Sequence, residues 1–135
     1  MLHNINHIGI AVQSLEANIP FYREALGMPF QGIEEVAEQK VRVAMLQVGE
    51  SKIELLEPTS PDSPIAKFLE KNGPGIHHIA YDVADIEVAI AQMIANGARM
   101  IDEQPRNGAH GSRIAFVHPK SSGGVLTELC QPGHP

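Results

Sequence analysis

Two histidine–glutamate pairs recur in this chain at nearly the same spacing. Glu54 follows His7 by 47 positions, and Glu128 follows His78 by 50 positions. Neutral imidazoles and carboxylates are ligands of Co²⁺, Ni²⁺, Mn²⁺, Fe²⁺ and Zn²⁺. If the four side chains converge from separate strands, they can supply four ligands to one divalent ion and leave coordination positions open for water or substrate. These four residues are therefore candidate metal ligands.

The residues around the two pairs are also similar, which indicates an internal repeat. The phrase NHIGIAV begins at Asn6, and HHIAYDV begins at His77, so that His7 aligns with His78. The phrase IELLEP at residues 53–58 aligns with TELCQP at residues 127–132. A lone histidine on a strand is more often structural than a ligand. The recurrence of both residue types in equivalent positions reverses that judgement.

Strand geometry separates the adjacent histidines at positions 77 and 78. Successive side chains of a strand point to opposite faces, so the two imidazoles cannot both face one site. The repeat selects His78 as the ligand and leaves His77 for packing or the surface. His7 then shares a face with Gly9 and Ala11, while His78 shares a face with Ala80 and Asp82. Small residues beside both histidines indicate an open cavity on that face.

The elements that position these residues are expected to repeat as well. In module one (about residues 4–58), Ser14 predicts the start of a helix that ends at Gly27, and Pro20 is expected to kink it or to delay its regular part. In module two (about residues 75–132), Asp85 and Gly97 bound the corresponding helix. A linker helix is expected at about residues 63–72. Strands are expected at residues 5–12, 30–36, 40–48, 51–58, 75–83, 98–103, 112–119 and 124–132.

Composition limits the classes of protein to which this chain can belong. Its 135 residues suit one domain, and the single cysteine, Cys130, excludes an intramolecular disulfide and indicates a cytoplasmic protein. The net charge of −6, without a clustered basic patch, argues against nucleic-acid binding. No apolar run approaches the length of a membrane helix, so no membrane association is expected.

A second candidate site lies in the sequence RNGAHGSR, residues 106–113. Glycines flank His110, so the backbone N–H groups of this loop can approach an anionic ligand closely. A solvated loop histidine is equally consistent with these residues.

These motifs together resemble the methylmalonyl-CoA epimerases of the vicinal oxygen chelate superfamily. The resemblance rests on NHIGIAV, KIELLEPTSPDSPIAKFLEKNGPGIHHIAYDV, GAHGSRIAFVHPK and GGVLTEL, and it covers essentially the whole chain. It implies an α+β fold in which two βαβββ modules form a curved, partly open mixed β-sheet barrel around a metal site, with the helices outside. It also implies one domain over residues 1–135 and a homodimer.

The resemblance assigns a role to each candidate residue. One divalent ion per chain is expected, with Co²⁺ favoured and Ni²⁺, Mn²⁺, Zn²⁺ or Fe²⁺ as alternatives. The implied metal ligands are His7, Glu54, His78 and Glu128. The implied substrate-binding residues are His110, Gly111 and Ser112. The implied catalytic residues are Glu38 and Glu128, and Glu34 and Glu35 lie close enough in sequence to compete with Glu38.

The implied reaction inverts the carbon between the thioester and the carboxylate of methylmalonyl-CoA, a small-molecule CoA thioester. Removal of the α-proton gives an enolate whose charge the metal stabilises, and inversion needs a base on each face. Glu38 and Glu128 are the two candidate bases. If Glu128 is a ligand only, an ordered water or His110 serves the second face.

Two other functions fit the same superfamily. A glyoxalase I-type lactoylglutathione lyase also moves a proton beside a carbonyl with His and Glu ligands, and dehydratases, thiol transferases and dioxygenases are more distant options. A non-enzymatic small-molecule binding protein, as in bleomycin resistance, uses the cavity without a metal. Such a protein does not need both His–Glu pairs.

Overall fold

The computed structural model describes residues 2–133, so residues 1, 134 and 135 of the predicted domain lie outside it. The chain divides into two compact units. The first unit is His7–His77, and the second comprises residues 2–6 and 78–133. Among the described residues, no helix has both the length and the apolar character that a bilayer crossing requires.

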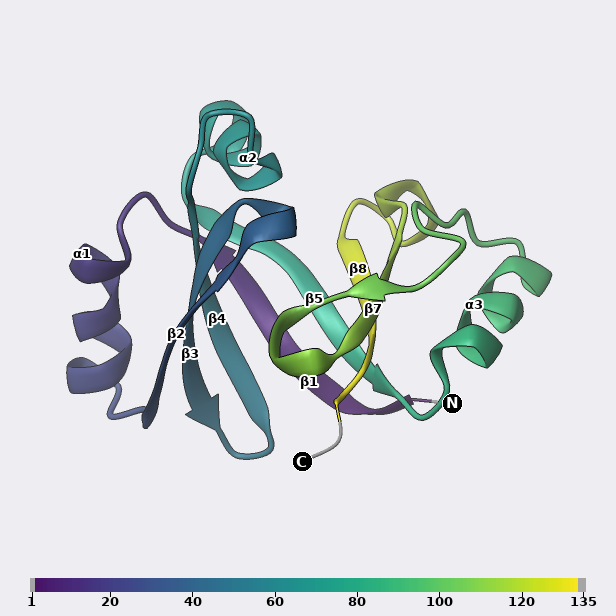
Figure 1. The fold of residues 1–135 in the computed structure, drawn as a ribbon, viewed down its shortest axis with the longest axis horizontal. Coiled ribbons are helices and arrows are strands. Elements are labelled where there is room, and N and C mark those ends of the chain that lie inside the picture. Colours follow the sequence, from purple (N-terminus) through teal and green to yellow (C-terminus); the bar gives the residue numbers. More distant parts are fainter. Residues whose placement is uncertain (1, 134–135) are drawn as a thin grey trace. The chain divides into compact units, whose positions relative to one another are not determined.

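The first unit contains four strands in the order β2-β3-β4-β1 (Figure 1). Strand β4 pairs parallel with β1, and the β2–β3 and β3–β4 pairs are antiparallel. Its elements are β1 (Leu2–Ala11, which begins in the second unit), α1 (Leu15–Pro20), the π-helical turn η1 (Phe21–Ala25), β2 (Phe30–Val36), the 3₁₀ turn η2 (Ala37–Gln39), β3 (Val41–Val48), β4 (Ser51–Pro58) and α2 (Pro64–Asn72).

The second unit repeats this plan with the strand order β1-β5-β8-β7-β6. Strand β5 pairs parallel with β8, and β7 pairs antiparallel with β8 and with β6. Its elements are β5 (Gly75–Val83, which begins in the first unit), α3 (Ile86–Ala95), β6 (Arg106–Asn107), η3 (Ala109–Gly111), β7 (Arg113–Val117), η4 (Pro119–Ser121) and β8 (Leu126–Gln131). The predicted α+β class with two mixed, repeated modules is confirmed.

The first helix follows the sequence signals closely. The hydroxyl of Ser14 accepts a hydrogen bond from the backbone N–H of Ala17 at 3.1 Å, so Ser14 is the N-cap. Regular α-helix ends at Pro20, and the next turn is π-helical, with Leu26 N–H donating to the Phe21 carbonyl at 2.9 Å. Proline cannot donate the usual backbone hydrogen bond, and the helix changes from α to π at this residue, where a kink or a delay of the regular helix was predicted.

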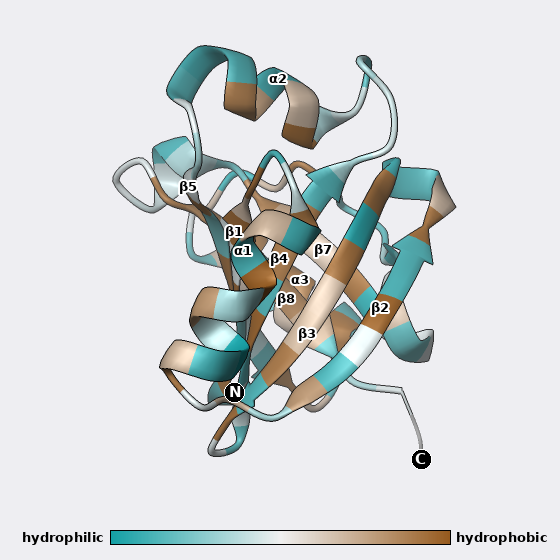
Figure 2. Ribbon diagram, turned by 90° about the vertical axis from the view of Figure 1, so that its left-hand side faces the viewer, coloured by the Kyte–Doolittle hydropathy of each residue, from teal (hydrophilic) through white to brown (hydrophobic). Residues whose placement is uncertain are grey.

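Each unit has its own apolar core between its helix and its strands. In the first unit, Leu15 and Ile19 of α1 pack against Leu46 and Leu55 of the strands. In the second unit, Ile86 and Ile90 of α3 pack against Val117 and Leu129. Strand β2 is partly buried at every second residue, and Figure 2 shows hydrophobic and hydrophilic residues along it. The helices thus cover one face of the strands, which leaves the other face for a site.

The prediction of a strand at residues 98–103 is wrong. Only an isolated bridge between Met100 and Val117 forms there, and the next strand is the two-residue β6. The N–H groups of Ile101 and Asp102 both donate to the Phe116 carbonyl, at 2.8 and 3.2 Å. The Asp102 carboxylate accepts from Phe116 N–H at 2.9 Å and replaces a backbone partner. A side chain therefore ends the ladder that the apolar pattern predicted.

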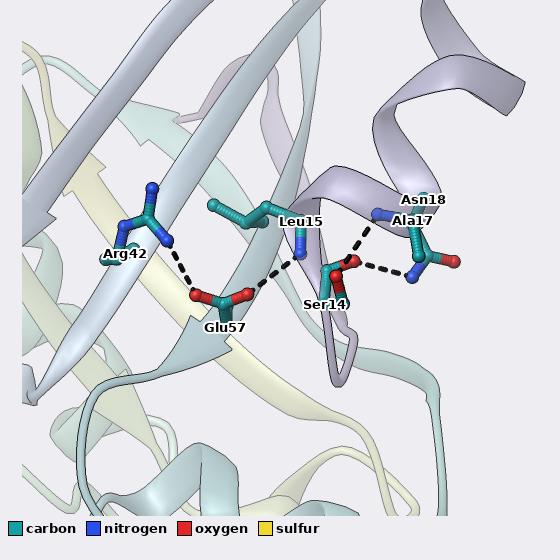
Figure 3. A network of polar contacts seen from close by, with 6 residues as sticks. All are labelled: Ser14, Leu15, Ala17, Asn18, Arg42 and Glu57. Carbon is teal, nitrogen blue, oxygen red and sulfur yellow. Dashed lines mark hydrogen bonds and ion pairs between the residues drawn. The ribbon is translucent and has the colours of Figure 1, made fainter.

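A repeated side-chain contact fixes the start of both main helices. In the first unit, the Glu57 carboxylate accepts from Leu15 N–H at 2.9 Å and from the Arg42 guanidinium at 2.8 Å (Figure 3). In the second unit, the Gln131 side-chain oxygen accepts from Ile86 N–H, also at 2.9 Å. Both contacts satisfy a backbone N–H that the helix itself leaves unpaired.

We expect Glu57→Ala to lower the free energy of unfolding by about 2 kcal/mol, because hydrogen bonds to a partly buried charge contribute roughly 1.5–3 kcal/mol. Chemical denaturation monitored by circular dichroism measures this loss. Glu50→Ala removes the same charge from the exposed β3–β4 turn and serves as the control. Equal losses in the two variants would show that the contact with Leu15 does not anchor α1.

Candidate active site

The first histidine–glutamate pair is buried on one face of β1 and β4. Nδ1 of His7 lies 3.3 Å from Oε2 of Glu54, and the two residues are 5% and 8% exposed. The parallel register places Gly9 directly beside Glu54, and His7 lies two residues before Gly9 on the same face. Because Gly9 has no side chain, it leaves room beside the carboxylate.

The second pair repeats this arrangement on β5 and β8. Nε2 of His78 lies 3.2 Å from Oε1 of Glu128, and both residues are buried. Ala80 is the register partner of Glu128, and His78 again lies two residues earlier. The structure thus brings each predicted pair together within its own unit, with a small residue beside each carboxylate.

The chemistry of each pair suits a cation. A buried carboxylate is expensive to desolvate unless a proton, a positive charge or a metal ion compensates it. Each pair offers one imidazole nitrogen and one carboxylate oxygen, the donor types that divalent transition metals accept. The residues present therefore fit the metal that the sequence implied.

The neighbours of His78 distinguish it from the adjacent histidine. The His78 ring meets the Phe116 ring edge to face, with 5.7 Å between the ring centroids. In the first unit, His77 instead packs edge to face on Phe68 of α2, with the centroids 5.0 Å apart. Packing is one of the two roles, packing or the surface, that the sequence left open for His77.

Asp82 is an acidic residue on the same face as His78, and the sequence alone assigned no role to it. One oxygen of its carboxylate accepts from the Asn4 side chain at 2.5 Å, and the other accepts from the Asn6 side chain at 2.7 Å. Its position in the first unit is taken by Ala11. Asp82 therefore ties β1 to β5 through both oxygens, and the alternation of β5 was the only sequence signal for it.

The proposed base Glu38 lies in an exposed turn after β2. The turn closes at Lys40, which has left-handed backbone angles (φ 55°, ψ 48°) and accepts at its carbonyl from Thr59 N–H at 2.9 Å. The Lys40 ammonium also pairs with Asp62. That contact, with a second hydrogen bond from Ser60, lowers the pKa of Asp62 to about 2. The turn that carries Glu38 is thus fixed to the segment after β4.

The register of β2 separates the two neighbouring glutamates. Glu34 pairs with Val43, which pairs with Leu56, so Glu34 shares a sheet face with Glu54. Glu35 pairs with Arg42 and lies on the opposite face. Of the two alternatives to Glu38, Glu34 is the one on the face of the first His–Glu pair.

The loop between β6 and β7 holds the three predicted substrate-binding residues. His110 has left-handed backbone angles (φ 55°, ψ 37°), and Gly111 follows with φ 70°. Among residues 2–133, Lys40 and His110 are the non-glycine residues with positive φ. A Cβ atom at Gly108 would lie 2.6 Å from the Ser112 hydroxyl, so the loop closes tightly over a glycine. Strained backbone of this kind is common where a loop contacts a ligand.

Comparison with known proteins assigns the family. The sequence profile of the Glyoxalase/Bleomycin resistance protein/Dioxygenase superfamily matches residues 6–116. The chain belongs to this superfamily. Ethylmalonyl-CoA/methylmalonyl-CoA epimerase of Cereibacter sphaeroides is 43% identical over 133 residues, which cover 97% of this chain and 99% of the relative.

Two solved structures are similar to this chain over nearly its whole length. A methylmalonyl-CoA epimerase in complex with methylmalonyl-CoA and NH4+ is 45% identical, with a TM-score of 0.94 and coverage of 98% of this chain and 96% of that one. A hypothetical protein of Bacillus halodurans is 49% identical, with a TM-score of 0.95 and coverage of 97% and 95%. A more distant relative, a probable lactoylglutathione lyase of Vibrio cholerae, is 29% identical over 129 residues, 96% of this chain and 91% of the relative. The predicted resemblance to methylmalonyl-CoA epimerases is confirmed.

Proposed function

We propose that this protein is a metal-dependent epimerase that interconverts (2S)- and (2R)-methylmalonyl-CoA. The observation that carries the proposal is the buried His–Glu pair, which occurs twice in the same register. Its support from comparison is a full-length likeness to epimerases that act on methylmalonyl-CoA.

The proposed metal ligands are His7, Glu54, His78 and Glu128, one pair from each unit. The two imidazoles of His7 and His78 and the Glu128 carboxylate are donor types that could hold one ion. Co²⁺ is the ion we favour, with Ni²⁺, Mn²⁺, Zn²⁺ and Fe²⁺ as alternatives. When bound, the ion would supply Lewis-acid stabilisation of the negative charge that develops on the thioester oxygen.

The proton transfers fall to glutamates of this chain. Inversion requires that one base remove the proton from C2 and that a second group deliver a proton to the opposite face. We assign these roles to Glu38 and Glu128. Metal binding lowers the basicity of Glu128, so an ordered water or His110 is the alternative second group. The Ser112 N–H already donates to the Ala109 carbonyl at 3.1 Å, so the Gly111 N–H and the Ser112 hydroxyl are the groups that we assign to the anionic parts of the substrate.

The test is exchange of the substrate α-proton in ²H₂O. Protein stripped with a chelator and reloaded with Co²⁺ is incubated with one epimer of methylmalonyl-CoA, and deuterium at C2 and epimer composition are followed together. We expect exchange and inversion with metal and neither without it. Absence of exchange with the loaded protein would remove this function.

A glyoxalase I-type lyase is the second candidate, because the lactoylglutathione lyase relative spans almost the whole chain. Its test uses the hemithioacetal of methylglyoxal and glutathione as substrate under the same metal conditions. A non-enzymatic binding protein would show neither activity, and metal addition would not change its ligand affinity. It would also leave both buried His–Glu pairs without a role.

We further propose a homodimer in the cytoplasm. Large apolar side chains that are exposed, such as Phe21 at 56% and Ile76 at 60%, support burial against a second copy. Cys130, the single cysteine of the sequence, is buried, which accords with a reducing compartment. Light scattering that finds a stable monomer at micromolar concentration would contradict the dimer.

A further inference from the structure

Arg106 lies on the sheet face of the second His–Glu pair. Residues that pair directly across neighbouring strands point to the same face. Arg106 pairs with Ile114, and Ile114 pairs with Cys130. Cys130 lies two residues beyond Glu128 on β8 and so shares its face. The register therefore places the Arg106 side chain on the face that carries Glu128.

An aromatic ring connects Arg106 to the buried pair. The Arg106 guanidinium carbon lies 5.4 Å from the centroid of the Phe116 ring. The same ring meets His78 edge to face, and Phe116 is the register partner of Glu128. Phe116 is buried, so its ring fixes the guanidinium one side chain away from the proposed metal ligands.

The polar contacts of Arg106 leave part of its guanidinium available. Nε of Arg106 lies 3.3 Å from Oδ2 of Asp102, and the Arg106 side chain is 47% exposed. Asp102 is fixed in turn, because its carboxylate accepts from Phe116 N–H. The ion pair uses Nε, so the two terminal nitrogens remain to bind a planar anion, the geometry that arginine favours.

The repeat shows that this arginine is not required by the fold. The equivalent position in the first unit is Glu34, reached through the matching register of Val43 and Leu56. The first unit therefore carries an acidic residue, Glu34, where the second unit carries the basic residue Arg106. An opposite charge at equivalent positions indicates a role outside the common sheet architecture.

We propose that Arg106 binds an anionic oxygen of the acyl-CoA substrate, beside the loop that holds His110 and Ser112. This inference rests on the proposed function and names one further binding residue. The ligand chemistry is a carboxylate or phosphate oxygen. The acyl carboxylate and the CoA phosphates are its two sources on the same molecule.

The test compares Arg106→Gln and Arg106→Lys with Arg113→Gln. Arg113 is a matched control, since it is 44% exposed, pairs with Glu87 at 2.8 Å and lies on the opposite face through its register with Gln131. Dissociation constants are measured by calorimetry for methylmalonyl-CoA, for propionyl-CoA, which lacks the carboxylate, and for 3′-dephospho-methylmalonyl-CoA. Wild-type protein must first show exchange in ²H₂O, which tests the function separately.

We expect Arg106→Gln to weaken methylmalonyl-CoA binding about 10- to 100-fold, Arg106→Lys to weaken it less, and Arg113→Gln to change it by less than about threefold. Unchanged propionyl-CoA binding in Arg106→Gln identifies the carboxylate. If Arg106→Gln weakens the binding of both thioesters equally but does not weaken the binding of 3′-dephospho-methylmalonyl-CoA, the bound group is the phosphate. Wild-type affinity in Arg106→Gln, or equal losses in Arg106→Gln and Arg113→Gln, overturns the proposal while leaving the epimerase function intact.

Discussion

His78→Ala is expected to lower metal affinity by about a hundredfold or more, whereas His77→Ala changes it by less than about threefold. Loss of groups that only orient a ligand already weakens metal binding about 10- to 100-fold, and loss of a ligand itself removes a direct bond. His78 lies 3.2 Å from Glu128 and is buried, while His77 packs on Phe68. Competition with a chromophoric chelator at fixed pH measures both affinities.

The His77 variant is the control for the general effect of removing an imidazole from β5. Its expected defect is in stability, because the contact with the Phe68 ring is lost, and thermal unfolding will report it. His7→Ala should match His78→Ala, since the two histidines have the same register with their glutamates. A larger loss of metal affinity in His77→Ala would show that the alignment of the two repeats is off by one residue.

The internal repeat made much of this structure predictable from the sequence. The alignment of His7 with His78 predicted that both would face a glutamate, and the contacts at 3.3 and 3.2 Å agree. Local signals sufficed for the helix starts as well, because Ser14 and Asp85 accept hydrogen bonds from the first turns that follow them. Each of these features depends on residues close in sequence or on one repeated spacing.

Features that depend on pairing between residues far apart in the chain could not be predicted from the sequence. The expected strand at residues 98–103 failed because Asp102 bonds to Phe116, fourteen positions away. The place of Arg106 on the site face follows from two successive strand pairings, and no local pattern contains them. The Asp82 carboxylate likewise accepts hydrogen bonds from Asn4 and Asn6, which lie more than seventy residues earlier. Apolar alternation gives the face of one strand and not the register between strands.

The second large effect is expected in Glu38→Gln, which should lower the rate of inversion by about 10²- to 10⁴-fold, the usual contribution of a general base. Glu38 lies in an exposed turn and is not among the four proposed ligands, so metal affinity and fold should be retained. Glu128→Gln should instead weaken both metal binding and turnover, because an amide is a poorer, uncharged ligand and no base. Chelator competition and inversion rates are measured on the same preparations.

Glu35→Gln is the matched control for Glu38→Gln, because it removes the same charge from the face of β2 that points away from Glu54. Each epimer is assayed separately in ²H₂O. A protein with one remaining base should still exchange the α-proton of the epimer presented to that base, yet fail to invert it. Exchange without inversion in Glu38→Gln is thus the expected signature. Wild-type inversion in that variant would move the base elsewhere, and Glu34, on the face of Glu54, would be tested next, followed by His110.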